Sequence, residues 1–417
     1  MKAKRLILFL IWLMLSVAYF DRVNISVAGP TIMTALHLSK AQFGGALSAF
    51  QVGYALMQIP GGYLADRIGA RTLLISALVL WSGFTALTGS VGSLRTLIVV
   101  RVLFGFGEGI ENGAQFKLIG DNFAPAERSS ANALFLSALA VGPAVAAPVV
   151  TYLIRLVGWR SLFYGSALLG LVVAVVLALL LPRGTGSAAR GTPRARIADA
   201  DGLVPALSLK DLLHRPSSFL LFAAYLFFNI GFWGFVYWMP TYLSETRHIT
   251  LAKLGFTAAI PFVAGFFGLL VMGYLGSHAL RRFRPGLTAT GYIGAAASLF
   301  AAFSVSDVRS CIVALSAAAF FLYGGFGPFW AAALDRAPAS SRGTFTGFVN
   351  TGGQIGGIFA PVVVGRIFDV TRSFTGGFLF MIGALLLSAC SLWVLQSDPG
   401  RAVAPDDAEK SLAGDTL

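Results

Sequence analysis

The stretch LFYGSALLGLVVAVVLALLL, at residues 162–181, contains no charged residue and decides the class of the fold. A helix rises about 1.5 Å per residue, so this stretch is long enough to cross a hydrocarbon core of roughly 30 Å. The stretch LFMIGALLLSACSLWVL, at residues 379–395, has the same character. Both sequences predict membrane-spanning helices.

The composition extends this prediction to the whole chain. Of 417 residues, 56% are hydrophobic and 12% are charged, and the mean hydropathy is +0.77. A soluble domain carries about 25% charged residues on average. The surplus apolar side chains must therefore face lipid, and a soluble fold is excluded.

Loop signals divide the chain into twelve expected spans. These lie near residues 6–33, 43–65, 72–92, 95–122, 129–153, 160–181, 217–243, 253–277, 286–304, 309–333, 344–367 and 374–396. We predict an all-α integral membrane protein whose twelve transmembrane helices form two pseudo-symmetric six-helix bundles. Its expected parts are an N-terminal bundle (1–181), a cytoplasmic linker (182–216), a C-terminal bundle (217–396) and a cytoplasmic tail (397–417).

A weak internal repeat supports the two halves. Residues 141–150 read VGPAVAAPVV and residues 355–364 read IGGIFAPVVV, and each follows a segment that contains an arginine. Duplicated halves of this kind place a substrate site at their interface, near the middle of the bilayer.

The net charge of +13 is explained by membrane topology. If the N-terminus is cytoplasmic, most Lys and Arg residues fall on the inner side, as the positive-inside rule requires. We expect a multi-pass protein of the inner (plasma) membrane with both termini in the cytoplasm. Basic and aromatic residues are not interleaved as in nucleic-acid sites, and Cys311 and Cys390 form no metal or disulfide framework.

Charged residues within the spans gather in the first and fourth predicted helices: Asp21, Arg22, Arg101, Glu108, Glu111 and Lys117. Such residues are costly in lipid and almost always face the protein interior. Arg101 and Glu108 lie two turns apart on one helix face, about 10 Å along the axis, which is too far for an ion pair. Each needs another partner, either a counter-charge on the first helix, a substrate or a proton.

These residue types suit the coupled movement of an anion and protons. The guanidinium of Arg22 can bind a carboxylate through two parallel hydrogen bonds. Burial favours the protonated form of carboxylates such as Asp21 and Glu108. The alternative is a static cluster that ties the first helix to the fourth. We expect Glu111 and Lys117, nearer the cytoplasmic end, to reach the interface or form a local salt bridge.

The segment GGYLADRIGAR, at residues 61–71, resembles the signature between helices 2 and 3 of the major facilitators. The resemblance gives Asp66, Arg67 and Arg71 the role of a conformational latch. The second half has GYLGSHALRR at residues 273–282, without the acid, and predicts a weaker latch.

Two further segments, YFDRVNISVA (19–28) and QFGGALSAFQVGYALMQIPGG (42–62), resemble the anion:cation symporter family within the major facilitators. That family includes importers of galactonate, glucarate and hexuronates, carriers of aromatic acids, sialin and the vesicular glutamate transporters. The resemblance implies that Arg22 binds the substrate carboxylate. It also implies that Asp21 and Glu108 couple protons and that Arg101 modulates them.

The family pattern further implies that Tyr54, Asn350 and Gln354 face the substrate, although hydrogen bonds between helices explain the last two equally well. We add Gln115, where the family commonly has Asn, and Trp233 as an aromatic substrate contact. The segment EGIENG at residues 108–113 departs from the family's Glu-Ala-Pro-x-Phe-Pro, which leaves the substrate's identity open.

The function expected from these features is proton-coupled uptake of a small organic anion, such as a hexonate or hexuronate, by alternating access of a monomer. The alternative is an efflux or exchange carrier for an aromatic or other carboxylic acid. No Gly-x-x-x-x-Gly-Lys phosphate loop is present, so transport is not ATP-driven and no cofactor is implied. An enzyme is not expected, because all four histidines lie in loops or at span ends: His37, His214, His248 and His278.

Overall fold

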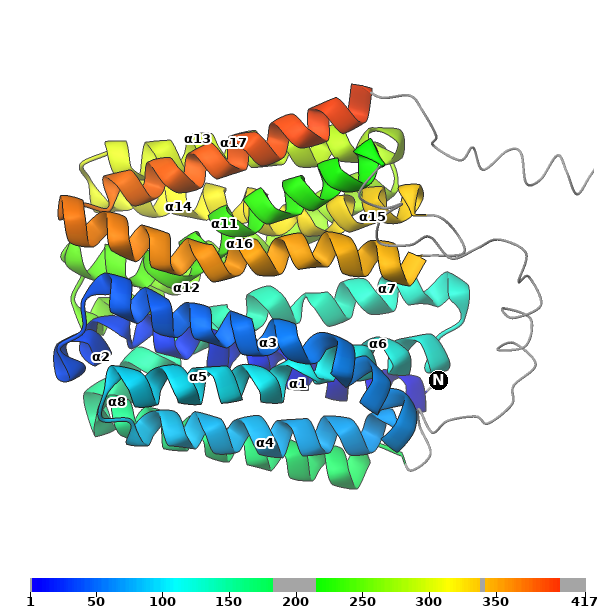
Figure 1. Cartoon of the computed structure of the whole chain (residues 1–417), viewed down its shortest axis with the longest axis horizontal. Coiled ribbons are helices and arrows are strands. Elements are labelled where there is room, and N and C mark those ends of the chain that lie inside the picture. Colours follow the sequence, from blue (N-terminus) through cyan, green and yellow to red (C-terminus); the bar gives the residue numbers. More distant parts are fainter. Residues whose placement is uncertain (1, 183–214, 338–341, 398–417) are drawn as a thin grey trace, which may run out of the picture.

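The computed structural model describes residues 2–182, 215–337 and 342–397. Most of the expected linker and tail lie outside these ranges. The described chain is built of helices in two bundles, which lie one above the other in Figure 1.

The first bundle contains α1 (Lys2–Val27), α2 (Gly29–Leu36), α3 (Lys40–Ile68), α4 (Ala70–Ser90), α5 (Leu94–Gly109), α6 (Glu111–Asn122), α7 (Pro125–Leu136) and α8 (Ala138–Leu180). The second contains α11 (Pro216–Glu245), α12 (Leu251–Ser277), the 3-10 turn η1 (Arg281–Phe283), α13 (Arg284–Ser304), α14 (Val308–Gly324), α15 (Phe326–Arg336), α16 (Arg342–Thr371) and α17 (Thr375–Ser397).

Each of the twelve expected spans is largely helical, and four of them (6–33, 95–122, 129–153 and 309–333) are divided between two helices. Length and apolarity alone select nine candidate spans among the described residues. One of them, Ala131–Leu180, reverses direction at Gly158, whose φ of 79° suits a residue without a Cβ. α3 and the α5–α6 pair are not among these nine candidate spans. The α5–α6 pair carries several of the charged residues singled out in the sequence.

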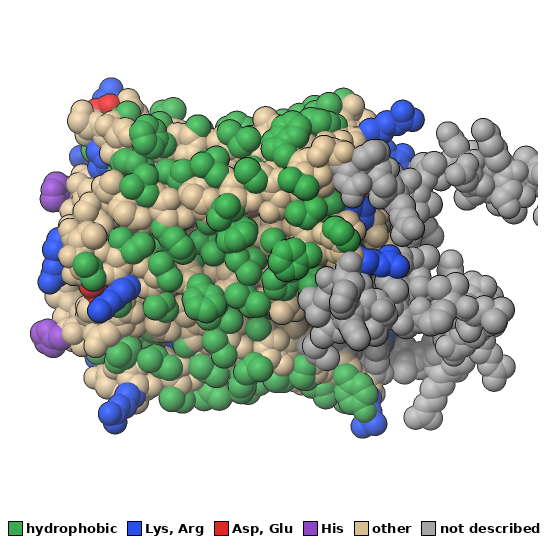
Figure 2. All heavy atoms as spheres, turned by 45° about the horizontal axis from the view of Figure 1, so that its top comes forward, with side chains coloured by type: hydrophobic (Ala, Val, Ile, Leu, Met, Phe, Trp, Pro, Cys, Tyr) green, Lys and Arg blue, Asp and Glu red, His purple; other side chains and the backbone are tan. Residues whose placement is uncertain are grey.

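The outer surface of the bundles is suited to lipid. Large apolar side chains such as Leu179 and Phe256, 77% and 74% exposed, point away from the core. Figure 2 shows hydrophobic side chains around the middle of the visible face, Lys and Arg at its two ends, and His at the left end. A contiguous exposed apolar surface of this kind marks contact with a membrane.

The two bundles are held together at the end of the molecule that carries α2, here called the α2 end (left in Figure 1). The carboxylate of Asp369, on α16, accepts hydrogen bonds from the backbone amides of Lys40 and Ala41, at 3.1 and 2.9 Å. It thereby caps the first turn of α3 in the other bundle. Lys40 also forms a salt bridge with Glu245, on α11, at 2.7 Å.

Candidate functional site

An ion pair joins α1 to α5 inside the first bundle. Arg22 donates a hydrogen bond from Nε to Oε2 of Glu108 at 2.6 Å, and the two side chains are 3% and 0% exposed. Of the three partners considered for Glu108, a counter-charge on the first helix, a substrate or a proton, the structure shows the first. A buried ion pair is retained only with good geometry, and removing one partner leaves an uncompensated charge.

Aromatic rings surround the Arg22 guanidinium. Its central carbon lies 4.5 Å from the ring centroid of Tyr19, 4.7 Å from that of Tyr54 and 5.2 Å from that of Phe50. Phe50 and Tyr54 come from α3. This helix can pack closely on α5 because Gly105 has no Cβ, which would collide with the backbone carbonyl of Phe50. The rings attract the cation through their π faces.

Arg101, also on α5, is 1% exposed. Its guanidinium carbon lies 5.0 Å from the centroid of Phe50 and 4.7 Å from that of Phe104. Its Nε and Nη2 have no hydrogen-bond partner. Across residues 2–182, 215–337 and 342–397, Arg101 forms no salt bridge with a carboxylate. It is therefore a buried cation whose charge no neighbouring group neutralises directly.

Asp21 is held by neutral donors and not by its neighbour Arg22. Asn24 donates from Nδ2 to Asp21 Oδ1 at 3.2 Å, and Thr85 of α4 donates from its hydroxyl to Oδ2 at 3.5 Å. The Asp21 side chain is buried. The two consecutive charges of α1 thus contact different helices, Asp21 reaching α4 and Arg22 reaching α5.

The helix that was expected to be continuous from residue 95 to 122 breaks at Ile110, between α5 and α6. Glu111 follows the break and is fully buried, and Gln115 donates from Nε2 to its Oε2 at 3.1 Å. The expectation that Glu111 reaches the interface or forms a local salt bridge is wrong, because it has neither solvent nor a salt-bridge partner in the described chain. Lys117 is half-buried, and its Nζ donates to the carbonyl of Ala65 at 3.5 Å.

The second bundle faces this cluster through α11. Trp233 stacks on Tyr237 with their centroids 5.0 Å apart, and both are buried. The hydroxyl of Tyr237 has no hydrogen-bond partner among the described residues. Ser26 of α1 donates to the Tyr237 carbonyl at 2.5 Å. The charged cluster therefore lies at the interface of the two bundles.

The sequence was compared with models of known protein families. The model described as Major Facilitator Superfamily matches residues 11–361, which is most of the chain. The chain belongs to the major facilitator superfamily.

Curated relatives of this transporter cover nearly its full length. A probable sulfoacetate transporter of Cupriavidus necator is 31% identical over 97% of this chain and 96% of its own. The hexuronate transporter of Bacillus subtilis is 27% identical over 90% of each chain. A D-galactonate transporter of Escherichia coli is 28% identical over 96% of this chain and 97% of its own. These relatives are named as transporters and not as enzymes.

Solved structures show the same fold. A bacterial homologue of the human lysosomal transporter Spinster, in an inward-facing and occupied conformation, has a TM-score of 0.74 at 19% identity. The match covers 94% of this chain and 96% of that one. The inward-facing and unoccupied form of a bacterial Spinster homologue gives a TM-score of 0.76 at 18% identity.

The signature segment, residues 61–71, contacts other helices of the first bundle. Arg71 donates from Nε and Nη2 to the carbonyls of Leu181 and Ala178, at 2.8 and 2.5 Å, and so ties α4 to the end of α8. Arg67 is exposed and lies 4.7 Å from the ring of Tyr63. The side chain of Asp66 lies outside the described part of the structure, so its latch role stays a prediction.

Two of the remaining predicted residues, Asn350 and Gln115, form hydrogen bonds with residues other than Arg22. Asn350 donates from Nδ2 to Gln58 Oε1 at 2.8 Å, which links α16 to α3 across the interface. Gln354 is half-buried one turn further along α16. Gln115 contacts Glu111. The structure thus gathers Arg22, Glu108 and Tyr54 into one cluster, and Arg101 lies on the ring of Phe50 that Arg22 also contacts.

Sequence reasoning missed two rings that shape the cluster, Tyr19 and Phe50. Phe50 precedes Tyr54 by four residues, so helical spacing would have placed both on one face. In the described ranges, no group of three His, Cys, Asp or Glu side chains is arranged to hold a metal.

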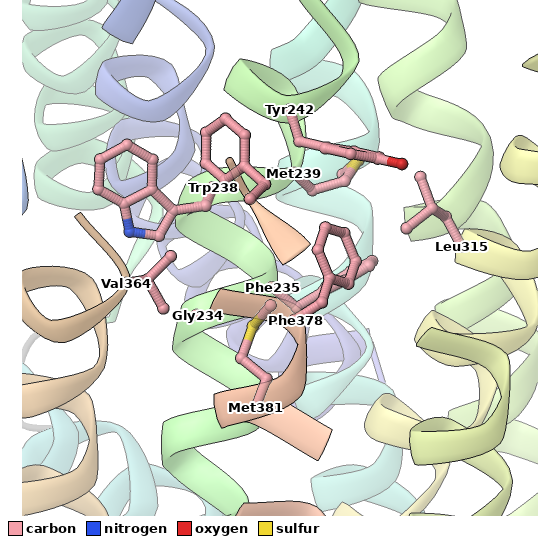
Figure 3. A pocket seen from close by; sticks show the side chains of 10 residues that line it. Gly234, Phe235, Trp238, Met239, Tyr242, Leu315, Val364, Phe378 and Met381 are labelled. Atoms are coloured by element: carbon pink, nitrogen blue, oxygen red, sulfur yellow. The ribbon is translucent and has the colours of Figure 1, made fainter. Parts of the chain in front are cut away.

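A separate recess lies inside the second bundle, between α11, α14, α16 and α17 (Figure 3). Its lining includes Trp238, Met239, Leu315 and Met381. Its lining has no charged side chain with which to bind an anion.

Proposed function

We propose that this transporter carries a small organic anion into the cell together with protons. The observation that supports this most directly is the ion pair of Arg22 and Glu108. It places an anion-binding guanidinium and a proton-binding carboxylate in direct contact, away from water.

The coupling follows from competition for one guanidinium. A charged Glu108 occupies Nε of Arg22. When Glu108 takes a proton, its attraction for the cation weakens and the fork of Arg22 becomes available to a substrate carboxylate. Release of that proton restores the internal ion pair and displaces the substrate. Asp21 precedes Arg22 in the sequence and accepts hydrogen bonds from the neutral side chains of Asn24 and Thr85. It is a second candidate proton carrier.

Alternating access requires the bundles to separate at one end at a time. We place the α2 end outside, with both termini in the cytoplasm and the chain in the inner membrane. In this state the α2 end is closed by Asp369, Lys40 and Glu245. The cluster itself is sealed, since Arg22, Arg101 and Glu108 are at most 2% exposed. A monomer contains every residue that this cycle uses.

The substrate class follows from the cluster and from the relatives. Arg22 recognises an anionic oxygen group, and Tyr54 and Trp233 combine an apolar face with a polar atom. Relatives are named for hexuronate, for galactonate and for sulfoacetate. We propose a small carboxylic acid of the sugar-acid class.

Uptake into proteoliposomes tests this function. Purified transporter is assayed with labelled glucarate, galactonate, glucuronate and sulfoacetate, with and without an acidic exterior. We expect at least one acid to accumulate only when the exterior is acidic. Efflux or exchange of an aromatic or other carboxylic acid is the competing function. If the transporter only exchanges acids, and a proton gradient enhances the exchange of none of them, the result would favour the exchange carrier and contradict proton-coupled uptake.

A further inference from the structure

We infer that the substrate carries two negative charges and that Arg101 binds the second. This rests on the proposed function and refines it. Arg22 alone explains the recognition of one anionic group, so a singly charged substrate would leave Arg101 without a role at the site.

The environment of Arg101 shows that it lacks an anion. Its Nε and Nη2 have no acceptor although the side chain is 1% exposed. A buried charge is costly unless it is paired and hydrogen-bonded. The neighbouring carboxylates are engaged elsewhere, Glu108 with Arg22 and Asp21 with Asn24 and Thr85.

Arg22 and Arg101 belong to one binding region because both lie against the ring of Phe50. Their guanidinium carbons are 5.2 and 5.0 Å from its centroid. Arg22 also has an unpartnered group, Nη2. Each arginine thus retains a donor with no acceptor, and one molecule with an acidic group at each end can reach both.

The balance of charge supports the same conclusion. The Glu108 carboxylate offsets the charge of Arg22 in the present state. When both Glu108 and Asp21 are protonated, Arg22 and Arg101 together leave two positive charges in a buried region. A dianion neutralises both, whereas a monoanion leaves one guanidinium buried and uncompensated.

Matched pairs of acids test this inference by direct binding. Each pair shares a carbon skeleton and differs by one acidic group: gluconate with glucarate, and acetate with sulfoacetate. Dissociation constants are measured by calorimetry on the full chain in detergent. In each pair of which at least one acid binds, we expect the dianion to bind at least about tenfold more tightly than the monoanion, because it gains a second charge-assisted contact.

Substitutions at Arg101 assign the preference to this residue. In Arg101→Gln the dianion should lose its advantage, while the monoanion's dissociation constant stays within about threefold of wild type. Arg101→Lys keeps the charge and should keep most of the preference. Arg95 is the matched control, since it is exposed on the same helix, and Arg95→Gln should bind as wild type does.

The outcomes separate this inference from the proposed function. If the monoanion and the dianion bind with equal affinity in every pair that binds at all, the inference that the substrate carries two negative charges is wrong, while the proposed anion transport is unaffected. A preference that persists in Arg101→Gln would overturn the assignment to Arg101. Absence of binding by all four acids would contradict the proposed function as well. If Arg101→Gln does not fold, the dianion preference is measured in Arg101→Lys instead. Loss of the preference in Arg101→Lys would contradict the inference that the charge at position 101 binds the second acidic group.

Discussion

Arg22 donates its Nε to Glu108 at 2.6 Å while its Nη2 has no partner. The guanidinium therefore has one edge engaged by the protein and one polar group still available. An incoming anion can contact Arg22 before the internal ion pair breaks. This arrangement lets substrate binding and proton binding influence each other through one side chain.

The first prediction concerns the geometry of Arg22. Arg22→Lys keeps the charge but loses the planar fork and the stacking on Tyr19 and Tyr54. We expect substrate affinity to fall by at least about thirtyfold, which corresponds to the lower end of the roughly 2–5 kcal/mol lost when a buried charged contact is truncated. Calorimetry on the purified transporter measures it.

A lysine replacement at Arg160 is the control. Arg160 donates to the carbonyls of Gly89 and Val91, away from the cluster. An affinity within twofold of wild type in Arg22→Lys would remove Arg22 from the substrate site.

The second prediction concerns the contact that closes the α2 end. Asp369→Ala removes the acceptor for the amides of Lys40 and Ala41 and the favourable charge at the start of α3. A loss of about 1–2 kcal/mol should open this end roughly five- to thirtyfold more often. A cysteine at Ser48, where the hydroxyl contacts the Ile358 carbonyl across the interface, reports the opening by its labelling rate.

Asp121→Ala, an exposed change on α6, serves as the matched control. The native Cys311 and Cys390 are replaced in all variants so that only the reporter reacts. Equal labelling rates in the Asp369 and Asp121 variants would show that the cap does not hold the bundles together.

Much of the fold could be predicted from the sequence because a lipid environment leaves few options for the backbone. Charge-free stretches of sufficient length must be helices, and loop signals separate them. The spacing of Arg101 and Glu108 also indicated that Glu108 needs a partner elsewhere, such as a counter-charge on the first helix, and in the structure Arg22 contacts it. Both side chains are buried, and a buried charge is favourable only when it is paired.

Other features depend on tertiary structure and could not be predicted. The break at Ile110 buries Glu111 instead of directing it toward the interface, and no proline in the segment announces it. Asp369 caps a helix whose first residue lies 329 positions away, so no local pattern indicates the contact. The unpartnered state of Arg101 depends on which neighbours engage the nearby carboxylates.

The third prediction concerns Glu111. Glu111→Gln keeps the shape of the side chain and its contact with Gln115, and it keeps the position neutral, as expected for a buried carboxyl group with no counter-charge within salt-bridge distance in the described chain. We expect the free energy of unfolding to change by less than about 1 kcal/mol. Thermal unfolding in detergent, followed by tryptophan fluorescence, measures it. A loss of about 3 kcal/mol or more would show a charged and paired Glu111 instead.

The most direct test of proton coupling is Glu108→Gln, compared in two assays on the same vesicles. The amide cannot release a proton, so the variant should bind the substrate and exchange internal for external substrate at rates near wild type. It should fail to accumulate substrate against its gradient when the exterior is acidic. Counterflow that persists while proton-driven accumulation is lost is the result predicted here. Accumulation equal to wild type would contradict this account and make the Arg22–Glu108 pair a static connection between α1 and α5.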